Sequence, residues 1–329
     1  MFASTIQAMN HFGVTEELLR RVLAAALEMG GDYADLYFEH TFNNLVGLMD
    51  GQVNNCSSNI DFGVGVRVIA GEQTGYAYVE GVTPEELLRA AHTAARIATS
   101  GQPHPVAQRI EKQRTRDCYL IDQSWEEVEL KAKIPFLEKL NSRIFALDNR
   151  VIKVQVTLAD STSHVFFCNS EGVSYYDYRP MGAFSVVCVM QQEGVVENGY
   201  AARAFRRGFE MMSDVLVETL AREVVDHTAI LFNAIKPKGG EMPVVMGAGG
   251  SGILLHEAIG HAFEADFNRK RTSIFCDQLG KKICNEQIQV VDDATIPYNR
   301  GSIHFDDEGV EGQKTYLVKD GVLNSYLHD

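Results

Sequence analysis

Two histidines and a glutamate stand out because their types and spacing could activate water on a metal ion. Residues 256–261, HEAIGH, place the Glu257 carboxylate directly after the first of two imidazoles, His256 and His261. Neutral imidazoles bind Zn²⁺, and an adjacent carboxylate can take a proton from water as a general base. Given ten histidines and 44 acidic residues in 329 positions, roughly 0.04 such arrangements are expected by chance. The alternative is a partly exposed helix that merely carries these side chains.

The spacing of the two histidines predicts a distorted helix. Side chains five residues apart lie about 140° from each other around an ideal α-helix, against about 40° for the better-known spacing of four. A single π-turn absorbs one extra residue and would bring His256 and His261 together. Gly260 is the position where a distorted backbone costs least. We therefore expect a helix over about Ile253–Ala265 with local π-winding.

A glycine-rich stretch, Gly247–Gly252, precedes this helix. Such a turn at a helix N-terminus can bind phosphate, but the Lys-Ser/Thr pair that completes a P-loop is missing. A tight turn that lets the helix approach a sheet is the simpler interpretation. A short buried strand is expected just before it, over Pro243–Met246.

The pattern of the remaining chain predicts an α+β fold. Helices are expected over Thr15–Met29, Thr83–Thr99, Ser124–Leu147 and Asp214–Asn233, the second opened by a Thr83–Glu86 capping box. Alternating segments predict strands over Ala34–His40, Asn44–Met49, Phe62–Ile69, Thr74–Val79, Val151–Leu158, His164–Cys168, Val173–Tyr178, Ala183–Met190, Val195–Ala201, Gln289–Val291, Ser302–Phe305, Thr315–Lys319 and Val322–Leu327. Turns are expected at Asp50-Gly51, Glu171-Gly172 and Asp320-Gly321.

These elements predict two domains, in keeping with about 150 residues per domain. Residues 1–236 would form an N-terminal domain of helices packed on antiparallel sheets. It divides into possible halves, 1–105 and 106–236, joined by a Gly101–Pro105 linker. Because both halves have the order helix, strands, helix, an ancient duplication is one interpretation, and two units that merely look alike is the other. Residues 237–329 would form a mostly antiparallel β domain that carries the 256–261 helix.

Composition excludes several classes of function. The balance of 30 Lys and Arg against 44 Asp and Glu leaves a net charge of −14 without a basic cluster, which argues against nucleic acid or an anionic membrane as partner. No apolar run approaches a membrane span, and the N-terminus lacks the pattern of a secretory signal. The cysteines are expected to be free thiols in a cytoplasmic protein. They are Cys56, Cys118, Cys168, Cys188, Cys276 and Cys284.

Several segments resemble the TldD branch of the TldD/PmbA family of metallopeptidases. They are HEAIGHAFEADFNRK, VVDDATIPYNRGSIHFDDEG and DGVLNSYLHD in the C-terminal part, and DYADLYFEH, DGQVNNCSSNIDFGVGVRV and TPEELLRAA in the N-terminal part. The resemblance implies a zinc-dependent peptidase that cuts small or unfolded peptides. His256 and His261 would then be zinc ligands, and Glu257 would be the general base. It also implies a homodimer, or a hetero-oligomer with a PmbA (TldE) subunit that lacks the motif.

The family resemblance places the third zinc ligand, a cysteine, after the point where this chain stops. The domain over 237–329 is therefore expected to be incomplete, and a non-catalytic subunit or binding module is the alternative function. Cys276 and Cys284 could serve as ligands, but a structural role is favoured for both. His304 is a further candidate, and for it a strand histidine without a ligand role is the favoured interpretation. Glu264 and Asp266 are expected either to support the ligands or to face solvent.

Overall fold

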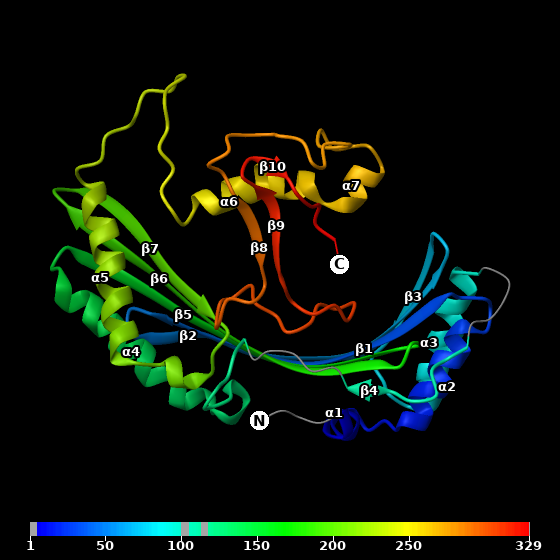
Figure 1. Ribbon diagram of the computed structural model, residues 1–329. Coiled ribbons are helices and arrows are strands. Elements are labelled where there is room, and N and C mark those ends of the chain that lie inside the picture. Colours follow the sequence, from blue (N-terminus) through cyan, green and yellow to red (C-terminus); the bar gives the residue numbers. More distant parts are fainter. Residues whose placement is uncertain (1–4, 100–104, 113–117, 329) are drawn as a thin grey trace. The chain divides into compact units, whose positions relative to one another are not determined.

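The computed structural model describes residues 5–99, 105–112 and 118–328. Its largest element is a seven-stranded sheet in the order β3-β2-β1-β5-β6-β4, with β7 paired to β6 (Figure 1). The strands are β1 (Tyr33–Met49), β2 (Gln52–Ala70), β3 (Gln73–Val79), β4 (Glu111–Lys112), β5 (Val151–Asn169), β6 (Val173–Gln192) and β7 (Val195–Phe205). All neighbours are antiparallel except β4, which runs parallel to β6. The predicted α+β class is confirmed.

Several strands that the sequence divides in two are continuous. The segments expected at Ala34–His40 and Asn44–Met49 merge into β1, because β1 is paired along its length with β2 and β5. Thr41, in the polar stretch between them, is buried and donates its hydroxyl to Ser163 of β5 at 2.8 Å. Polar residues of the kind found in turns are therefore stable in a strand when their backbone groups are hydrogen-bonded to both neighbouring strands and their side chains have partners.

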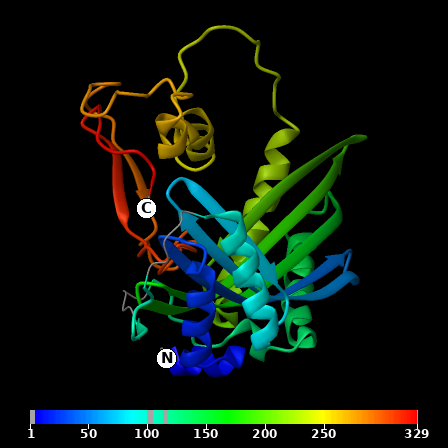
Figure 2. The same ribbon diagram turned by 90° about the vertical axis from the view of Figure 1, so that its right-hand side faces the viewer.

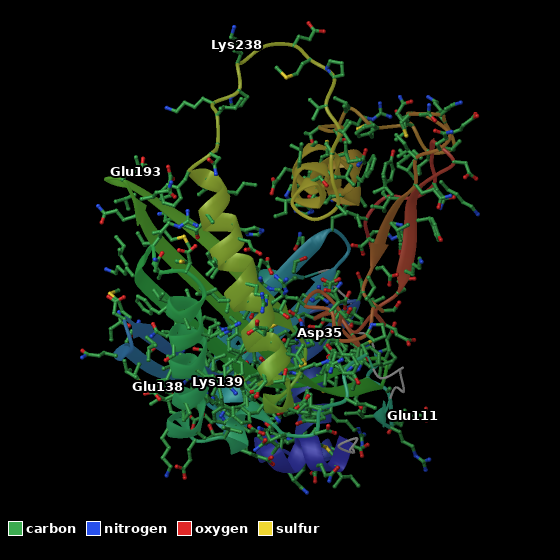
Figure 3. All side chains as sticks on the ribbon, turned by 90° about the vertical axis from the view of Figure 1, so that its left-hand side faces the viewer. Asp35, Glu111, Glu138, Lys139, Glu193 and Lys238 are labelled. Carbon is green, nitrogen blue, oxygen red and sulfur yellow. The ribbon has the colours of Figure 1, made fainter. Side chains whose placement is uncertain are left out.

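Three hairpins use acidic-Gly turns with two positive φ angles. Asp50-Gly51 has φ of 51° and 81°, and Asp320-Gly321 has 52° and 77°. Both central residues of a type I′ turn need φ > 0, which explains the glycine at the second position. Glu193-Gly194, with 49° and 83°, forms the same turn at the tip of the β6–β7 hairpin, where Figure 3 labels Glu193.

Two groups of helices cover the same face of the sheet. The first is α1 (Thr5–Phe12), α2 (Glu16–Leu27) and α3 (Pro84–Ile97), and Figure 2 shows α2 beside α3. The second is α4 (Leu130–Leu147) and α5 (Asp214–Leu231). The expected Thr83–Glu86 capping box opens α3 and is confirmed. Leu36 and Phe38 of β1 pack in the first core, and Val46 and Leu48 of the same strand pack in the second.

The sheet face is polar between these two cores. Lys133 of α4 and Asp160 of β5 form an ion pair of 2.7 Å, and both side chains are 1% exposed. Nearby, His11 of α1 stacks on His164 of β5, with ring centroids 4.4 Å apart, and its Nε2 lies 3.0 Å from Nδ1 of His40. Charged groups such as Lys133 and Asp160 are tolerated inside only because they are paired.

The chain forms two compact units. The sheet unit comprises Met1–Ala234 and Pro297–Glu311, and the histidine unit comprises Ile235–Ile296 and Gly312–Asp329. The domain limits expected from the sequence, 1–236 and 237–329, stay a prediction, and most of the expected 101–105 linker lies outside the described residues. None of the helices within 5–99, 105–112 and 118–328 combines the length and the apolar run that crossing a bilayer requires.

The histidine unit has a small core beside a three-stranded sheet. Strands β8 (Val290–Asp293), β9 (Lys314–Lys319) and β10 (Val322–Leu323) are antiparallel in the order β10-β9-β8. Two predicted strands are wrong. Pro243–Met246 is irregular, and its Val245 is 98% exposed, because nothing in the described unit covers it. Ser302–Phe305 contains only a single bridge, between Phe305 and Glu311, and packs in the sheet unit instead.

Candidate metal centre

The helix that carries the two histidines changes its winding at the motif. It begins as α6 (Ser251–Leu255), continues as a π-turn over His256–Gly260, and ends as a 3₁₀ turn over His261–Phe263. The N–H of His261 donates to the carbonyl of His256, which is the i→i+5 bond of a π-helix. The π-winding predicted from the histidine spacing is therefore confirmed.

This winding brings three side chains together. One ligand atom from each of His256, Glu257 and His261 lies within 4.8 Å of the others, and all three residues are exposed. The two rings lie 4.6 Å apart between centroids with an angle of 64°, and Nε2 of His261 is 3.8 Å from Oε2 of Glu257. Within the described part of the chain, this is the one group of three or more His, Cys, Asp or Glu side chains that converges in this way. Two imidazoles and a carboxylate are ligands that zinc accepts, so the donor set fits a divalent metal.

Gly260 leaves room for the first histidine. Its φ of −55° is ordinary for a helix, so the position does not need glycine for its backbone angle. A Cβ atom at this position would instead lie 3.1 Å from Nδ1 of His256. The sequence indicated the correct residue, but the reason is space beside the imidazole.

Glu264 contacts the second histidine on the side away from Glu257. Its Oε1 lies 2.6 Å from Nδ1 of His261. This hydrogen bond is the largest cause of the raised pKa of His261, and the charges of Glu264 and Glu257 add to it. Since Nδ1 is paired with Glu264, Nε2 is the nitrogen of His261 that faces Glu257.

Buried groups hold the end of the motif helix in place. Phe263 is fully buried in the core of the histidine unit, and Ile259 packs against the same core. Asn268 of α7 (Ala265–Arg269) donates Nδ2 to the carbonyls of Ala262 and Glu264 at 2.9 and 2.8 Å. Asn268 was not among the residues predicted for the site, and an amide shortly after a helix end is the one sequence signal for it.

Three other candidates from the sequence lie apart from the cluster. Cys276 Sγ donates to the carbonyl of Asn268 at 3.3 Å, and Cys284 Sγ lies 3.9 Å from the carbonyl of Gly321. Both are free thiols with local partners. Asp266 pairs with Lys270 at 3.3 Å in the first turn of α7.

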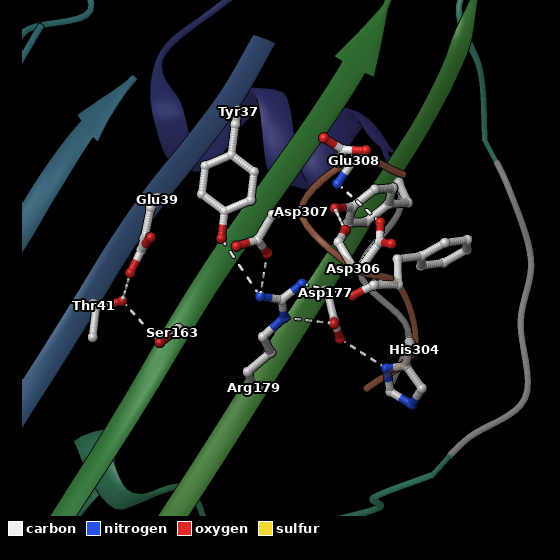
Figure 4. Close-up of polar contacts among 12 residues, drawn as sticks. Tyr37, Glu39, Thr41, Ser163, Asp177, Arg179, His304, Asp306, Asp307 and Glu308 are labelled. Atoms are coloured by element: carbon white, nitrogen blue, oxygen red, sulfur yellow. Dashed lines mark hydrogen bonds and ion pairs between the residues drawn. The ribbon is translucent and has the colours of Figure 1, made fainter. Parts of the chain in front are cut away.

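His304 belongs to a buried network of the sheet unit (Figure 4). Its Nδ1 lies 2.7 Å from Oδ1 of Asp177, and its Nε2 accepts the backbone N–H of Cys118 at 3.0 Å. Burial alone would raise the pKa of Asp177, yet the hydrogen bond from His304 and the charge of Arg179 hold it below its usual value. Because both ring nitrogens of His304 are used, this histidine has no free ligand atom for a metal.

Comparisons with known proteins agree with the fold. Three family models match the chain, described as the PmbA/TldA metallopeptidase domain 1 (residues 34–98), central domain (123–232) and C-terminal domain (239–329). The TldD homologue of Haemophilus influenzae, named a metalloprotease, is 35% identical over 91% of this chain and 63% of its own length. The metalloprotease TldD homologue of Buchnera aphidicola (Acyrthosiphon pisum) is 32% identical over 99% of this chain and 67% of its own length.

Solved structures support the same fold at lower sequence identity. TldE from Thermococcus kodakarensis superposes with a TM-score of 0.73 at 20% identity, over 95% of this chain and 70% of that one. A proposed modulator of DNA gyrase from Thermotoga maritima gives 0.78 at 21% identity, over 95% and 71%.

Together the fold and the three matched domain models define a chain of the PmbA/TldA metallopeptidase type. The chain belongs to the PmbA/TldD family of metallopeptidases. It spans about 63% to 67% of the length of the first two curated relatives.

Proposed function

We propose that this chain is the HExxxH-bearing subunit of a zinc-dependent peptidase that hydrolyses small or unfolded peptides. The observation that carries the proposal is the convergence of His256, Glu257 and His261 on the π-turn, within 4.8 Å of one another. Relatives named as metalloproteases, 32% to 35% identical, support the same class of reaction.

The two imidazoles are the proposed metal ligands. Nε2 of His261 faces the cluster because Nδ1 is held by Glu264. Zn²⁺ bound there would act as a Lewis acid towards the scissile carbonyl and would lower the pKa of water towards 7. A catalytic zinc usually has three protein ligands, and Cys276 and Cys284 have backbone carbonyls as their partners instead.

Glu257 is the proposed general base. Its carboxylate directly follows a ligand and lies 3.8 Å from Nε2 of the other histidine, so it is close to any water between the imidazoles. Its side chain is 62% exposed, and it can therefore accept a proton and return it to the leaving amine without a buried charge. General-base catalysis of this kind contributes about 10²–10⁴-fold to a rate.

The assembly and the location of the protein are also proposals. We propose a homodimer, or a hetero-oligomer with a PmbA/TldE-like subunit, in the cytoplasm. The structural likeness to TldE and the free thiols support this. The net charge of −14 disfavours nucleic acid as a partner.

A single substitution tests the mechanism. Glu257→Gln is expected to keep the zinc content, measured by mass spectrometry, and to lower cleavage of an unstructured fluorogenic peptide by at least about 100-fold. Glu286→Gln is the matched control, because Glu286 is an exposed acid paired with Lys282. Wild-type protein without zinc, or a Glu257→Gln variant that cleaves like wild type, would contradict the mechanism.

A non-catalytic subunit is the second candidate function. It is favoured by the donor set of the described residues, which contains only two imidazoles besides the proposed base. Assays of the chain alone and mixed with a TldE-type partner separate the two candidates. Zinc binding without cleavage in either assay would support the non-catalytic subunit.

A further inference from the structure

The two ring nitrogens of His261 face two different carboxylates. Nδ1 lies 2.6 Å from Oε1 of Glu264, and Nε2 lies 3.8 Å from Oε2 of Glu257. We propose that Glu264 is a positioning residue, which orients His261 and fixes its tautomer so that Nε2 is presented to the metal. This inference rests on the proposed metal site and adds to it a residue that acts only through His261.

The chemistry of the pair determines the tautomer. A neutral imidazole has one N–H donor and one lone-pair acceptor, whereas a carboxylate only accepts hydrogen bonds. The hydrogen of His261 must therefore reside on Nδ1, which leaves the lone pair on Nε2. Carboxylates that accept from the second nitrogen of a ligand histidine fix the orientation of the ring and make it a stronger ligand.

The backbone holds Glu264 where it can do this. The residue leaves the helix with φ −60° and ψ 132°, while its N–H still donates to the carbonyl of His261 at 3.2 Å. Its own carbonyl accepts from Asn268, whose side chain is buried. Glu264 is therefore fixed at its main chain on both sides, unlike a freely moving surface acid.

Leu327 holds the same turn through two backbone hydrogen bonds. Leu327 donates its N–H to the carbonyl of Phe263 at 2.8 Å, and its carbonyl accepts from the N–H of Ala265 at 2.9 Å. These two bonds flank Glu264 and form a parallel bridge between Glu264 and Leu327. The main chain at Glu264 is thus held by a residue 63 positions further along the chain.

Asp266 provides a comparison within the same segment. It carries the same charge two residues further on, but it pairs with Lys270 at 3.3 Å, and among the described residues it makes no hydrogen bond or ion pair with either histidine. A purely electrostatic effect of a nearby acid would act at both positions. A positioning effect would act only at Glu264.

Three variants of the full chain, Glu264→Ala, Glu264→Gln and Asp266→Asn, test this role without relying on activity. The measurements are Zn²⁺ affinity by competition with a chromophoric chelator, and the visible spectrum of the Co²⁺-substituted protein. We expect Glu264→Ala to weaken Zn²⁺ binding by about 10–100-fold and to change the Co²⁺ bands. Glu264→Gln, whose amide oxygen can still accept from Nδ1, should recover most of the affinity, and Asp266→Asn should bind like wild type.

The outcomes separate this proposal from the proposed function. Wild-type affinity and an unchanged Co²⁺ spectrum in Glu264→Ala would overturn the positioning role while the metal site stands. An equal loss in Asp266→Asn would also overturn it, because the effect would then be one of charge. A wild-type chain that binds no Zn²⁺ would overturn both proposals.

Discussion

Both units of the molecule contain histidines beside carboxylates. The two sites differ in how deeply they are buried and in whether a ring nitrogen is left without a hydrogen bond. In the sheet unit, Asp177 is 1% exposed and pairs with His304, whose two ring nitrogens both have protein partners. In the histidine unit, His256 and His261 are exposed, and Nε2 of His261 lies 3.8 Å from Oε2 of Glu257, which is beyond hydrogen-bond distance. A histidine whose two ring nitrogens are both hydrogen-bonded thus has a structural role. A histidine with one unused nitrogen lone pair is available to bind a ligand.

The same contrast holds for apolar residues. The sheet unit buries many of its leucines and valines in two cores and exposes others, such as Val215, whereas Val244, Val245 and Ile253 of the histidine unit are 73%, 98% and 67% exposed. Exposed apolar surface of this kind is typical of sites that contact another polypeptide.

The largest expected effect concerns the buried ion pair of the sheet unit. Lys133→Ala leaves Asp160 buried without its partner and should lower the free energy of unfolding by about 3–5 kcal/mol. At about 2–4 °C per kcal/mol for a unit of this size, the melting temperature should fall by about 6–20 °C. Scanning calorimetry measures this change.

A substitution in the histidine unit, at His256, provides the comparison with Lys133→Ala. His256→Ala removes an exposed side chain, so metal-free protein should lose no more than about 0.5 kcal/mol while the proposed zinc binding is lost. If metal-free His256→Ala were destabilised as much as Lys133→Ala, the distinction between a paired structural group and an available ligand would fail.

A smaller effect should appear on acidification of the sheet unit. Burial, and then the charges of His164 and His40, lower the pKa of His11 to about 4, while Glu126 opposes the shift. As the pH falls from 6.5 towards 4, the unfolded chain takes up a proton that the folded chain resists, so the folded state loses stability. Because His11 is partly exposed, we expect a loss of only about 1 kcal/mol.

Melting curves between pH 7 and 5 test this expectation. His11→Asn should reduce the pH dependence, and His227→Asn should not, because His227 is exposed and lies beside the carbonyl of Tyr200, at 3.4 Å, outside the histidine cluster of His11. Equal slopes for wild type and His11→Asn would show that this histidine cluster does not couple to folding.

The smallest expected effect is at Gly260. An alanine methyl there would press on Nδ1 of His256 at 3.1 Å, so zinc affinity should fall by a few-fold. Stability should rise slightly, because alanine favours a helix over glycine by up to about 1 kcal/mol. Gly252→Ala in α6 is the control, since its Cβ would meet no atom within 4 Å. A loss of affinity in both variants would assign the effect to the helix as a whole.

The fold could be predicted from the sequence where the determining contacts are local. The Thr83–Glu86 capping box, the Asp50-Gly51 turn and the π-winding between His256 and His261 each depend on residues within five positions of one another. The helix α1 was missed because its short apolar pattern is weak without the sheet against which Ala8 and Phe12 pack.

Elements whose status depends on distant partners were predicted less well. Pro243–Met246 has the composition of a buried strand, but a strand needs a neighbour, and the described unit offers none. The same reason explains why β1 and β5 are longer than their apolar segments, since the partners Thr41 and Ser163 are separated by 122 residues.

What the sequence alone determined is the chemistry that residues 256–261 could perform and the winding that brings their side chains together, because both follow from residue types and spacing within one helix. The tertiary structure decided which other candidates are available to that chemistry. It occupied both nitrogens of His304, gave Cys276 and Cys284 carbonyl partners, and held Glu264 beside His261 through Leu327 and Asn268. These outcomes depend on hydrogen bonds and burial between segments that are distant in sequence, and no local pattern encodes them.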